Sequence, residues 1–215
     1  MGVEGVGTPP YRIETDRLVI RCWEPADASL LKDAIDRSLE HLRPWMPWTP
    51  AEPEELGVVV ERLRAFRAEF DAEENWIYGI LTPDDSRVLG GTGLHPRGNP
   101  GSVEIGYWVA ADEVRQGIAT EVTAVLARVA VELCGVDRVD VQVDPLNEVS
   151  ARVPKKLGFT YEGTLRRRLE RGEGVPRGDS MMFTMLREEL AASPCAAFTY
   201  TAYDVVGNRV VPDPA

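Results

Sequence analysis

A turn and the segment after it carry the strongest chemical signal in this sequence. Residues 103–109 alternate like a β-strand, and the turn at 114–120 follows them with one glycine, Gly117, ahead of a long amphipathic segment. The first N–H groups of a helix have no partner inside the helix, and the helix dipole adds positive charge there. A strand, a turn and a helix in this order predict a site for a pyrophosphate. The residues expected to form it are Arg115, Gln116, Gly117, Ile118, Ala119 and Thr120.

One glycine at a turn also occurs in ordinary strand–turn–helix crossovers, so the rest of the chain has to support the pyrophosphate site. A Rossmann nucleotide site is excluded, because no glycine trio follows the first expected strand. The cluster Gly90-Gly91-Thr92-Gly93 lies inside an expected hairpin. Close packing of strands explains that cluster better than a phosphate loop does.

The spacing of apolar residues predicts a chain that mixes helices and strands. Helices are expected over 28–39, 53–71, 117–134 and 147–157. Strands are expected over 17–22, 76–81, 88–94, 103–109, 138–143, 159–162 and 180–186. This order predicts an α/β (α+β) fold with a mixed central sheet flanked by helices.

Composition and charge narrow the function classes. The 215 residues suit one domain, and the net charge of -11 would repel nucleic acid. No apolar run approaches the ~18–20 residues that span a bilayer, and the N-terminus lacks a signal pattern, so a cytoplasmic protein is expected. The distant cysteines Cys22, Cys134 and Cys195 predict neither a metal site nor a disulfide framework. His95 has no spacing partner, so no metal or nucleophile role is expected for it.

Four segments at matching spacing are similar to the GNAT superfamily of N-acetyltransferases, most of all to its RimJ/RimL-type branch, which acetylates the N-termini of ribosomal proteins. They are EIGYW at 104–108, GIATE at 117–121, NEVS at 147–150 and KLGF at 156–159. The match covers about residues 15–187. It implies a GNAT domain over 11–190 that binds acetyl-CoA and transfers the acetyl group directly to a primary amine, by family default a protein N-terminal α-amine.

The ends of the chain lie outside that domain. Residues 1–10 are rich in glycine and proline and are expected to be a disordered lead-in. Residues 191–215 form a C-terminal extension, and Gly207-Asn208 between two apolar runs predicts a β-hairpin there. The hairpin could add strands to the sheet or clasp a second subunit, so a homodimer is expected.

The resemblance also implies which residues hold acetyl-CoA. A backbone N–H around Trp108 or Val109 would bind the thioester carbonyl, in the manner of an oxyanion hole. Asn147 would bond the pantetheine arm, with a helix N-cap as its alternative role. Arg115 and Lys156 would supply the positive charge that an anionic cosubstrate needs on an acidic protein.

A carboxylate is needed to take the proton of the amine, and Glu104 is the first candidate. Alternation along the strand places Glu104, Gly106 and Trp108 on one face, and the superfamily often carries a basic carboxylate on this strand. The alternative is a half-exposed strand glutamate with a salt-bridge partner. Glu170 and Asp179 are the rival acids on the acceptor side, and Asp179 could instead be structural.

The departing CoA thiolate needs a proton donor, and here the sequence departs from the family. Many GNAT enzymes use a tyrosine at the position that Pro154 occupies. Ser150 lies one helical turn earlier on the same face and resembles the serine that RimJ/RimL-type relatives use. Pro154 also removes the hydrogen bond to the Ser150 carbonyl. A first-turn cap is the alternative role of Ser150.

The loop HLRPWMPW at 41–48 is the most unusual local sequence. Its tryptophans, Trp45 and Trp48, predict an aromatic wall for the acceptor, by resemblance to a similar loop in RimJ/RimL-type enzymes. Hydrophobic cover over the edge of the sheet is the alternative, and one tryptophan could do each.

Two other functions stay open at this point. One is acetylation of a small amine or aminoacyl compound, and the other is a CoA-binding sensor module with little catalysis. The proline at Pro154 is the best support for the sensor. Neither a metal nor another cofactor is expected.

Overall fold

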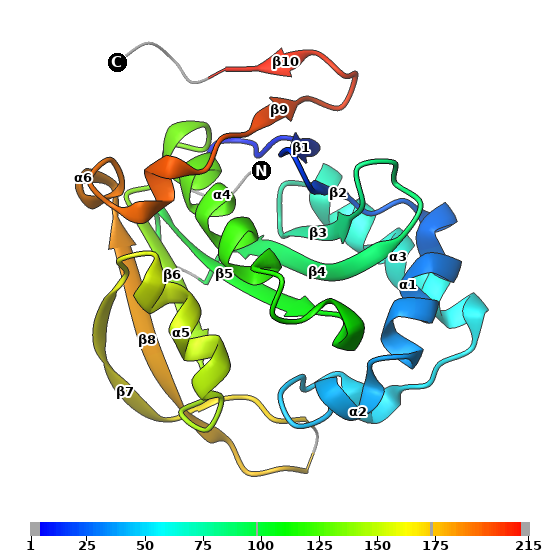
Figure 1. The fold of residues 1–215 in the computed structure, drawn as a ribbon. Coiled ribbons are helices and arrows are strands. Elements are labelled where there is room, and N and C mark those ends of the chain that lie inside the picture. Colours follow the sequence, from blue (N-terminus) through cyan, green and yellow to red (C-terminus); the bar gives the residue numbers. More distant parts are fainter. Residues whose placement is uncertain (1–4, 98, 173, 212–215) are drawn as a thin grey trace.

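The structure, a computed structural model, describes residues 5–97, 99–172 and 174–211. Within these residues one ten-stranded sheet runs in the order β10-β9-β1-β2-β3-β4-β5-β6-β8-β7 (Figure 1). The strands are β1 (Arg12–Glu14), β2 (Val19–Cys22), β3 (Trp76–Leu81), β4 (Val88–His95), β5 (Ser102–Val109), β6 (Arg138–Val143), β7 (Thr160–Leu169), β8 (Gly178–Leu186), β9 (Thr201–Tyr203) and β10 (Arg209–Val210). The mixed sheet flanked by helices that the sequence predicts is confirmed.

Helices cover both faces of the sheet (Figure 1). The helices α1 (Ala28–Asp36) and α3 (Leu56–Asp71) form one core with Val19, while α4 (Ile118–Glu132) and α5 (Glu148–Lys156) form another with Ile20. Neighbouring residues of β2 enter different cores because side chains alternate along a strand. The shorter elements are α2 (Leu39–Leu42), α6 (Arg187–Leu190), η1 (Pro25–Asp27), η2 (Thr49–Ala51), η3 (Ala111–Glu113) and η4 (Pro194–Ala197).

Two glycines set the ends of α4, the helix nearest the predicted pyrophosphate site. Gly117 precedes the helix with φ +82°, and Gly135 follows it with φ +71°. Both angles lie in the left-handed region that a side chain disfavours. The helix between them is apolar along most of its length and packs on β5 and β6. The two glycines therefore fix where α4 starts and which end faces the turn.

The sheet opens between β5 and β6, its parallel pair. Three residue pairs join these strands, Ser102 with Arg138, Val103 with Val139, and Glu104 with Asp140. Beyond these pairs, β5 continues to Val109 and β6 to Val143, and no further residue of β5 pairs with β6 in the described part of the chain. This leaves one backbone edge of β5 open over its second half.

The first and last described segments of the chain both lie on the β1 side of the sheet, whose edge strand is β10. Strand β9 pairs with β1 and β10 pairs with β9, so the predicted hairpin extends the sheet. Residues 1–4 lie outside the described residues. From Gly5 on, the lead-in contacts the core: the Gly7 N–H donates to the Cys134 carbonyl, and Pro9 and Pro10 are buried. This packing differs from the disorder expected for residues 1–10.

Some elements differ from the sequence expectation for local reasons. Strand β1 and helix α2 have three and four residues, too short for a periodic pattern. Strand β7 extends well past residue 162, because two register shifts let it follow β8. None of the described helices is long and apolar enough to cross a membrane. The described residues also contain no cluster of three or more metal-ligating side chains.

Candidate functional site

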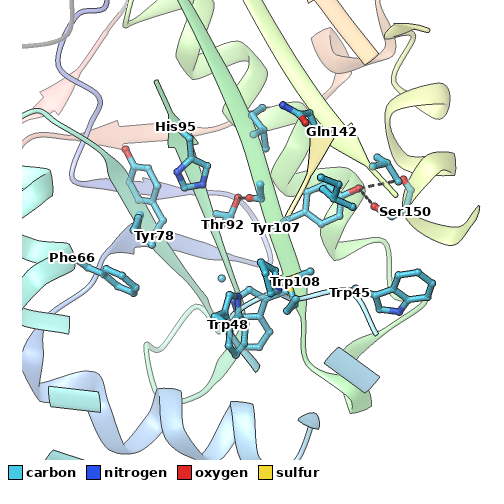
Figure 2. A pocket seen from close by; sticks show the side chains of 18 of the residues that line it. Trp45, Trp48, Phe66, Tyr78, Thr92, His95, Tyr107, Trp108, Gln142 and Ser150 are labelled. Atoms are coloured by element: carbon cyan, nitrogen blue, oxygen red, sulfur yellow. Dashed lines mark hydrogen bonds between the residues drawn. The ribbon is translucent and has the colours of Figure 1, made fainter. Parts of the chain in front are cut away.

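A cavity of about 600 Å³ passes through the open part of the sheet. On the α1/α3 side its walls include Trp48, Trp108 and His95, and on the α4/α5 side they include Tyr107 and Ser150 (Figure 2). A space that reaches both faces of a sheet requires the strands to separate, which β5 and β6 do. Two ligands could therefore enter from opposite faces and meet between these strands.

The turn before α4 presents backbone N–H groups, as its sequence predicts. Arg115 and Gly117 both have positive φ, +65° and +82°, which curls the chain into a tight loop. The first helical bond there runs from the Glu121 N–H to the Gly117 carbonyl, 3.0 Å. The N–H groups of Ile118, Ala119 and Thr120 precede that bond and are the ones a helix leaves unpaired. Gln116 is exposed, and its amide donates to Glu113 at 2.9 Å.

A second arginine lies beside this turn and was not identified from the sequence. Arg17 donates through Nε to the Glu121 carboxylate at 3.0 Å and through Nη1 to the Gln116 carbonyl at 3.2 Å. Thr15 also donates to Glu121, at 2.6 Å. Glu121 is buried in the first turn of α4, where its charge would repel a phosphate. Arg17 offsets that charge, and only the folded chain brings it there from the turn between β1 and β2.

The open edge of β5 offers hydrogen-bonding groups to a ligand. The Ala110 N–H donates to the Leu89 carbonyl across the β4–β5 pair at 2.8 Å. In an antiparallel pair, residues that point toward the partner strand alternate with residues that point away. The regular register therefore turns the N–H of Trp108 toward Gly91 and that of Val109 toward the opening. Of these two predicted thioester contacts, Val109 is the one whose N–H points toward the opening between β5 and β6, whereas the Trp108 side chain lines the cavity.

A pair of hydroxyl groups joins β5 to α5 across the opening. The Tyr107 hydroxyl lies 2.9 Å from Ser150 Oγ and 3.3 Å from the Ser150 carbonyl (Figure 2). That carbonyl would normally accept the N–H four residues later, which Pro154 lacks. The Tyr107 hydroxyl thus lies where it can donate to the Ser150 carbonyl, which receives no N–H from Pro154. Burial raises the pKa of Tyr107 to about 12, so this phenol stays protonated at neutral pH.

Asn147 caps α5 at the same opening. Its side-chain oxygen accepts the Ser150 N–H at 3.0 Å, which is the N-cap role considered as its alternative. Asn147 also lines the cavity. The cap orients the first turn of α5 and with it the Ser150 hydroxyl, so Ser150 points into the cavity from a fixed helix end.

Glu104 forms a salt bridge, as expected for the alternative in which it is a structural strand glutamate. Its carboxylate accepts from Arg97 at 3.1 Å and from the Gln142 amide at 2.5 Å. The side chain is 13% exposed and lies beside the lining residues Arg97 and Gln142, not among those that line the cavity. Any proton that Glu104 takes from a ligand would therefore pass through a water molecule or follow a shift of Gln142.

The acceptor side of the cavity combines large aromatic rings with a floor of glycines. Trp45 and Trp48 are both half-buried and line it, and the Trp48 ring lies edge-on to Trp108 at 6.1 Å. A Cβ atom on Gly91 would lie 2.5 Å from the Trp108 indole nitrogen. The glycines of β4 thus make room for rings that lie on the sheet, which is the close packing that the sequence predicts.

Three residues considered for the site lie outside the cavity. Lys156 is exposed at the far end of α5, whereas the first turn of that helix lines the cavity. Glu170 is exposed and pairs with Arg177, and the Asp179 carboxylate accepts the Arg167 N–H at 2.9 Å. Asp179 thus bonds the backbone of β7 from β8, and neither rival acid lines the cavity.

Comparisons with known proteins agree with this geometry. Residues 17–160 match the model of an acetyltransferase (GNAT) domain. The chain belongs to the GNAT family of N-acetyltransferases. An uncharacterized N-acetyltransferase of Bacillus subtilis, YoaA, is 27% identical over 162 residues, which cover 72% of this chain and 85% of YoaA. The ribosomal protein uS5-alanine N-acetyltransferase of Escherichia coli is 25% identical over 164 residues, which cover 72% of this chain and 81% of that enzyme.

Among solved structures, RimJ of Mycobacterium smegmatis, in complex with CoA-disulfide, has the same fold as this GNAT enzyme. The TM-score is 0.69 at 27% identity, covering 89% of this chain and 91% of RimJ. These relatives confirm the family and its resemblance to the ribosomal-protein acetyltransferases.

Proposed function

We propose that this GNAT enzyme transfers an acetyl group from acetyl-CoA directly to a protein N-terminal α-amine. The observation that supports this most is the cavity between β5 and β6, which residues from both faces of the sheet line. One side offers backbone N–H groups and hydroxyls suited to a CoA thioester. The other offers an aromatic wall suited to a second ligand. Relatives named for acetylating ribosomal proteins support the choice of acceptor.

Acetyl-CoA would bind mainly through the backbone. The N–H groups at the start of α4 would hold the pyrophosphate, with Arg115 and Arg17 adding positive charge. The open edge of β5 would pair with the pantetheine arm as a further strand would, and Asn147 lies beside that path. The Val109 N–H would bind the thioester carbonyl and stabilise negative charge on its oxygen.

The residues around the thioester would accept a proton from the amine and donate a proton to the thiolate. The neutral amine attacks the carbonyl carbon, a C–N bond forms, and the C–S bond breaks. An α-amine with a pKa near ~8 reaches the neutral form more easily than a lysine near ~10.4. Glu104, through Gln142 or water, is the proposed acceptor of the amine proton. Ser150 would donate its proton to the leaving thiolate and regain one from solvent through Tyr107, which holds Ser150 in place, and Glu104 would release the amine proton to solvent.

An amine on a small molecule is the second candidate acceptor. The loop that holds Trp45 and Trp48 covers the acceptor side of the cavity, which favours a short ligand over a folded surface. A CoA-binding sensor is less well supported, because Tyr107 and Ser150 offer the hydroxyl groups that Pro154 cannot. An N-terminal segment of a protein is itself short and extended, so it fits the same opening.

Release of CoA thiol from acetyl-CoA, measured against a panel of amines, tests the proposal. The panel would contain peptides with Ala or Ser N-termini, the same peptides with blocked N-termini, lysine peptides, polyamines and aminoacyl nucleotides. Saturable release with the free N-termini alone is expected. Release only with a small amine would select the second candidate. Binding of acetyl-CoA with no release for any amine would select the sensor.

The protein is further proposed to be a homodimer and to act in the reducing cytoplasm. Three buried free cysteines are compatible with such a compartment. The hairpin β9–β10 leaves a short strand at the edge of the sheet, which a second copy could extend. Light scattering on the full chain would give twice the chain mass if this is right, and the mass of one chain if it is wrong.

A further inference from the structure

We propose that His95 holds the acceptor amine, its Nε2 atom accepting a hydrogen bond from the nitrogen that attacks the thioester. This inference rests on the proposed transfer to an amine and names a residue for that step. His95 ends β4 directly opposite Glu104, where the open edge of β5 begins. Figure 2 shows the ring pointing into the cavity from the side of the sheet that faces Trp48 and Trp108.

Glycines give the imidazole its place on the sheet. A Cβ atom on Gly93 would lie 2.6 Å from His95 Nε2, and one on Gly106 would lie 3.2 Å from it. Any side chain at Gly93 would displace the ring, and a methyl at Gly106 would crowd it. The ring therefore lies over β4 and β5 with Nε2 near Gly106, the residue just past the last β5–β6 pair.

A chain of hydrogen bonds sets which ring nitrogen carries the proton. The Asn75 amide nitrogen donates to the Glu69 carboxylate at 3.0 Å, which leaves the Asn75 oxygen facing His95. That oxygen lies 2.7 Å from His95 Nδ1. An amide oxygen only accepts, so Nδ1 must be the protonated nitrogen. Nε2 is then the unprotonated nitrogen and can accept a hydrogen bond; no described residue donates to it, and His95 lines the cavity.

The ring also stays uncharged. Burial lowers the pKa of His95 to about 4, and the charge of Arg97 acts in the same direction. The ionisable groups around it are Arg97, Glu69 behind Asn75, and Glu104 opposite on β5. A neutral acceptor does not repel an approaching ammonium group. It also does not take the amine proton, for which Glu104 is the proposed acceptor.

These features define a positioning role in the reaction. One N–H of the amine would donate to Nε2, which would direct the nitrogen lone pair toward the thioester carbon. Positive charge grows on that nitrogen as the C–N bond forms and the C–S bond breaks, so the hydrogen bond strengthens in the transition state. The imidazole is not protonated in this step.

Nitrogen NMR of the full chain tests the tautomer and the contact without any turnover. The chain has two histidines, so ¹⁵N-histidine labelling gives two imidazoles, and a His41→Gln variant assigns them. We expect His95 to carry its proton on Nδ1 at neutral pH. With CoA present, the N-terminal amine of the peptide Ala-Ala-Ala should shift the Nε2 resonance, and a desamino analogue of that peptide should not. A proton on Nε2, or equal shifts with both peptides, would overturn the inference.

Kinetics of matched variants test the role in transfer. His95→Phe keeps the size of the ring and removes the acceptor, so kcat/KM for the alanine peptide should fall about 10- to 100-fold. His95→Gln can place an amide oxygen near Nε2 and should recover part of the loss. Binding of acetyl-CoA should not change in either variant. Full activity of His95→Phe in an active preparation would refute the role, whereas inactivity of the unaltered enzyme toward every amine would refute the proposed function instead.

Discussion

The two sides of the cavity are built in different ways. The side proposed for acetyl-CoA relies mainly on backbone, namely the open edge of β5 beside the cavity and the turn before α4, which lies outside the cavity lining. The acceptor side consists of side chains from the loop after α2, from β4 and from β5. Backbone groups do not depend on the identity of the residue that carries them. Recognition of CoA should therefore tolerate substitution, whereas recognition of the acceptor should not.

Ser150 and Tyr107 stand where the two sides meet, and their loss should have the largest effect. Ser150→Ala should lower kcat about 100-fold and leave acetyl-CoA affinity unchanged, because it removes a proton donor. Tyr107→Phe should lower kcat by about 10-fold, because Ser150 loses its partner. Single-turnover assays and calorimetry on both variants provide the measurement.

The double variant distinguishes a coupled pair from two independent groups. Removing both hydroxyls should be no worse than Ser150→Ala alone, because residues that act as a unit are not additive. Losses that multiply would show that Tyr107 acts separately from Ser150.

The tryptophans should affect the acceptor alone. Trp48→Ala should raise the KM for the amine about 10-fold, because it removes the ring that contacts Trp108. Trp45→Ala should have a smaller effect, since no ring contact fixes that side chain among the described aromatic pairs. Initial rates at saturating acetyl-CoA measure both. An unchanged KM in Trp48→Ala would assign this residue to hydrophobic cover.

Side chains at the CoA side should matter less. Arg115→Ala should weaken acetyl-CoA about threefold, the loss typical of an exposed charge, because the N–H groups remain. Lys156→Ala should leave affinity unchanged, because that residue lies at the far end of α5. Calorimetry at two salt concentrations would compare them, with Arg64→Ala on α3 as a charge-matched control. Abolished binding in Arg115→Ala would contradict a site made of backbone.

The acceptor side should also make the stability of the chain depend on pH. The pKa of His95 is about 4 in the folded chain and near ~6.5 when unfolded, so the unfolded chain binds more protons between these values. The contribution of His95 to stability is fully present above the unfolded pKa and is lost as pH drops through this window, by about 3 kcal/mol in total. Urea unfolding at pH 7 and pH 4.5 should show a smaller acid loss in His95→Phe than in the unaltered chain. Equal losses would show that other groups cause the acid sensitivity.

The same contrast explains what could be predicted from the sequence. The turn around Gly117 and the helix after it are local, and local periodicity and one glycine are enough to identify them. Arg17 and Tyr107 reach the site only through sheet pairing and helix packing, which no local pattern encodes. Pro154 was a usable signal, because an unpaired carbonyl requires a donor from somewhere. The KLGF motif placed Lys156 in the site. Lys156 is however the last residue of the nine-residue helix α5, whose first turn lines the cavity.

The hydrogen-bonded chain from Glu69 through Asn75 to His95 was likewise not predictable. Its members come from α3, from the loop before β3 and from β4, and no spacing rule connects them. The tautomer of His95 follows only once the orientation of the Asn75 amide is known. Alternation along β5 did place Glu104 on the face that carries Trp108, but its contact with Arg97 needed the fold.

The central claim is that two ligands meet in the opening between β5 and β6. An analogue in which CoA is joined through an acetyl bridge to the N-terminus of an alanine peptide tests it directly by calorimetry. The analogue should bind at least about 100-fold more tightly than CoA, because it occupies both sides at once. Trp48→Ala should remove much of that gain. An analogue that binds no more tightly than CoA itself would contradict the claim.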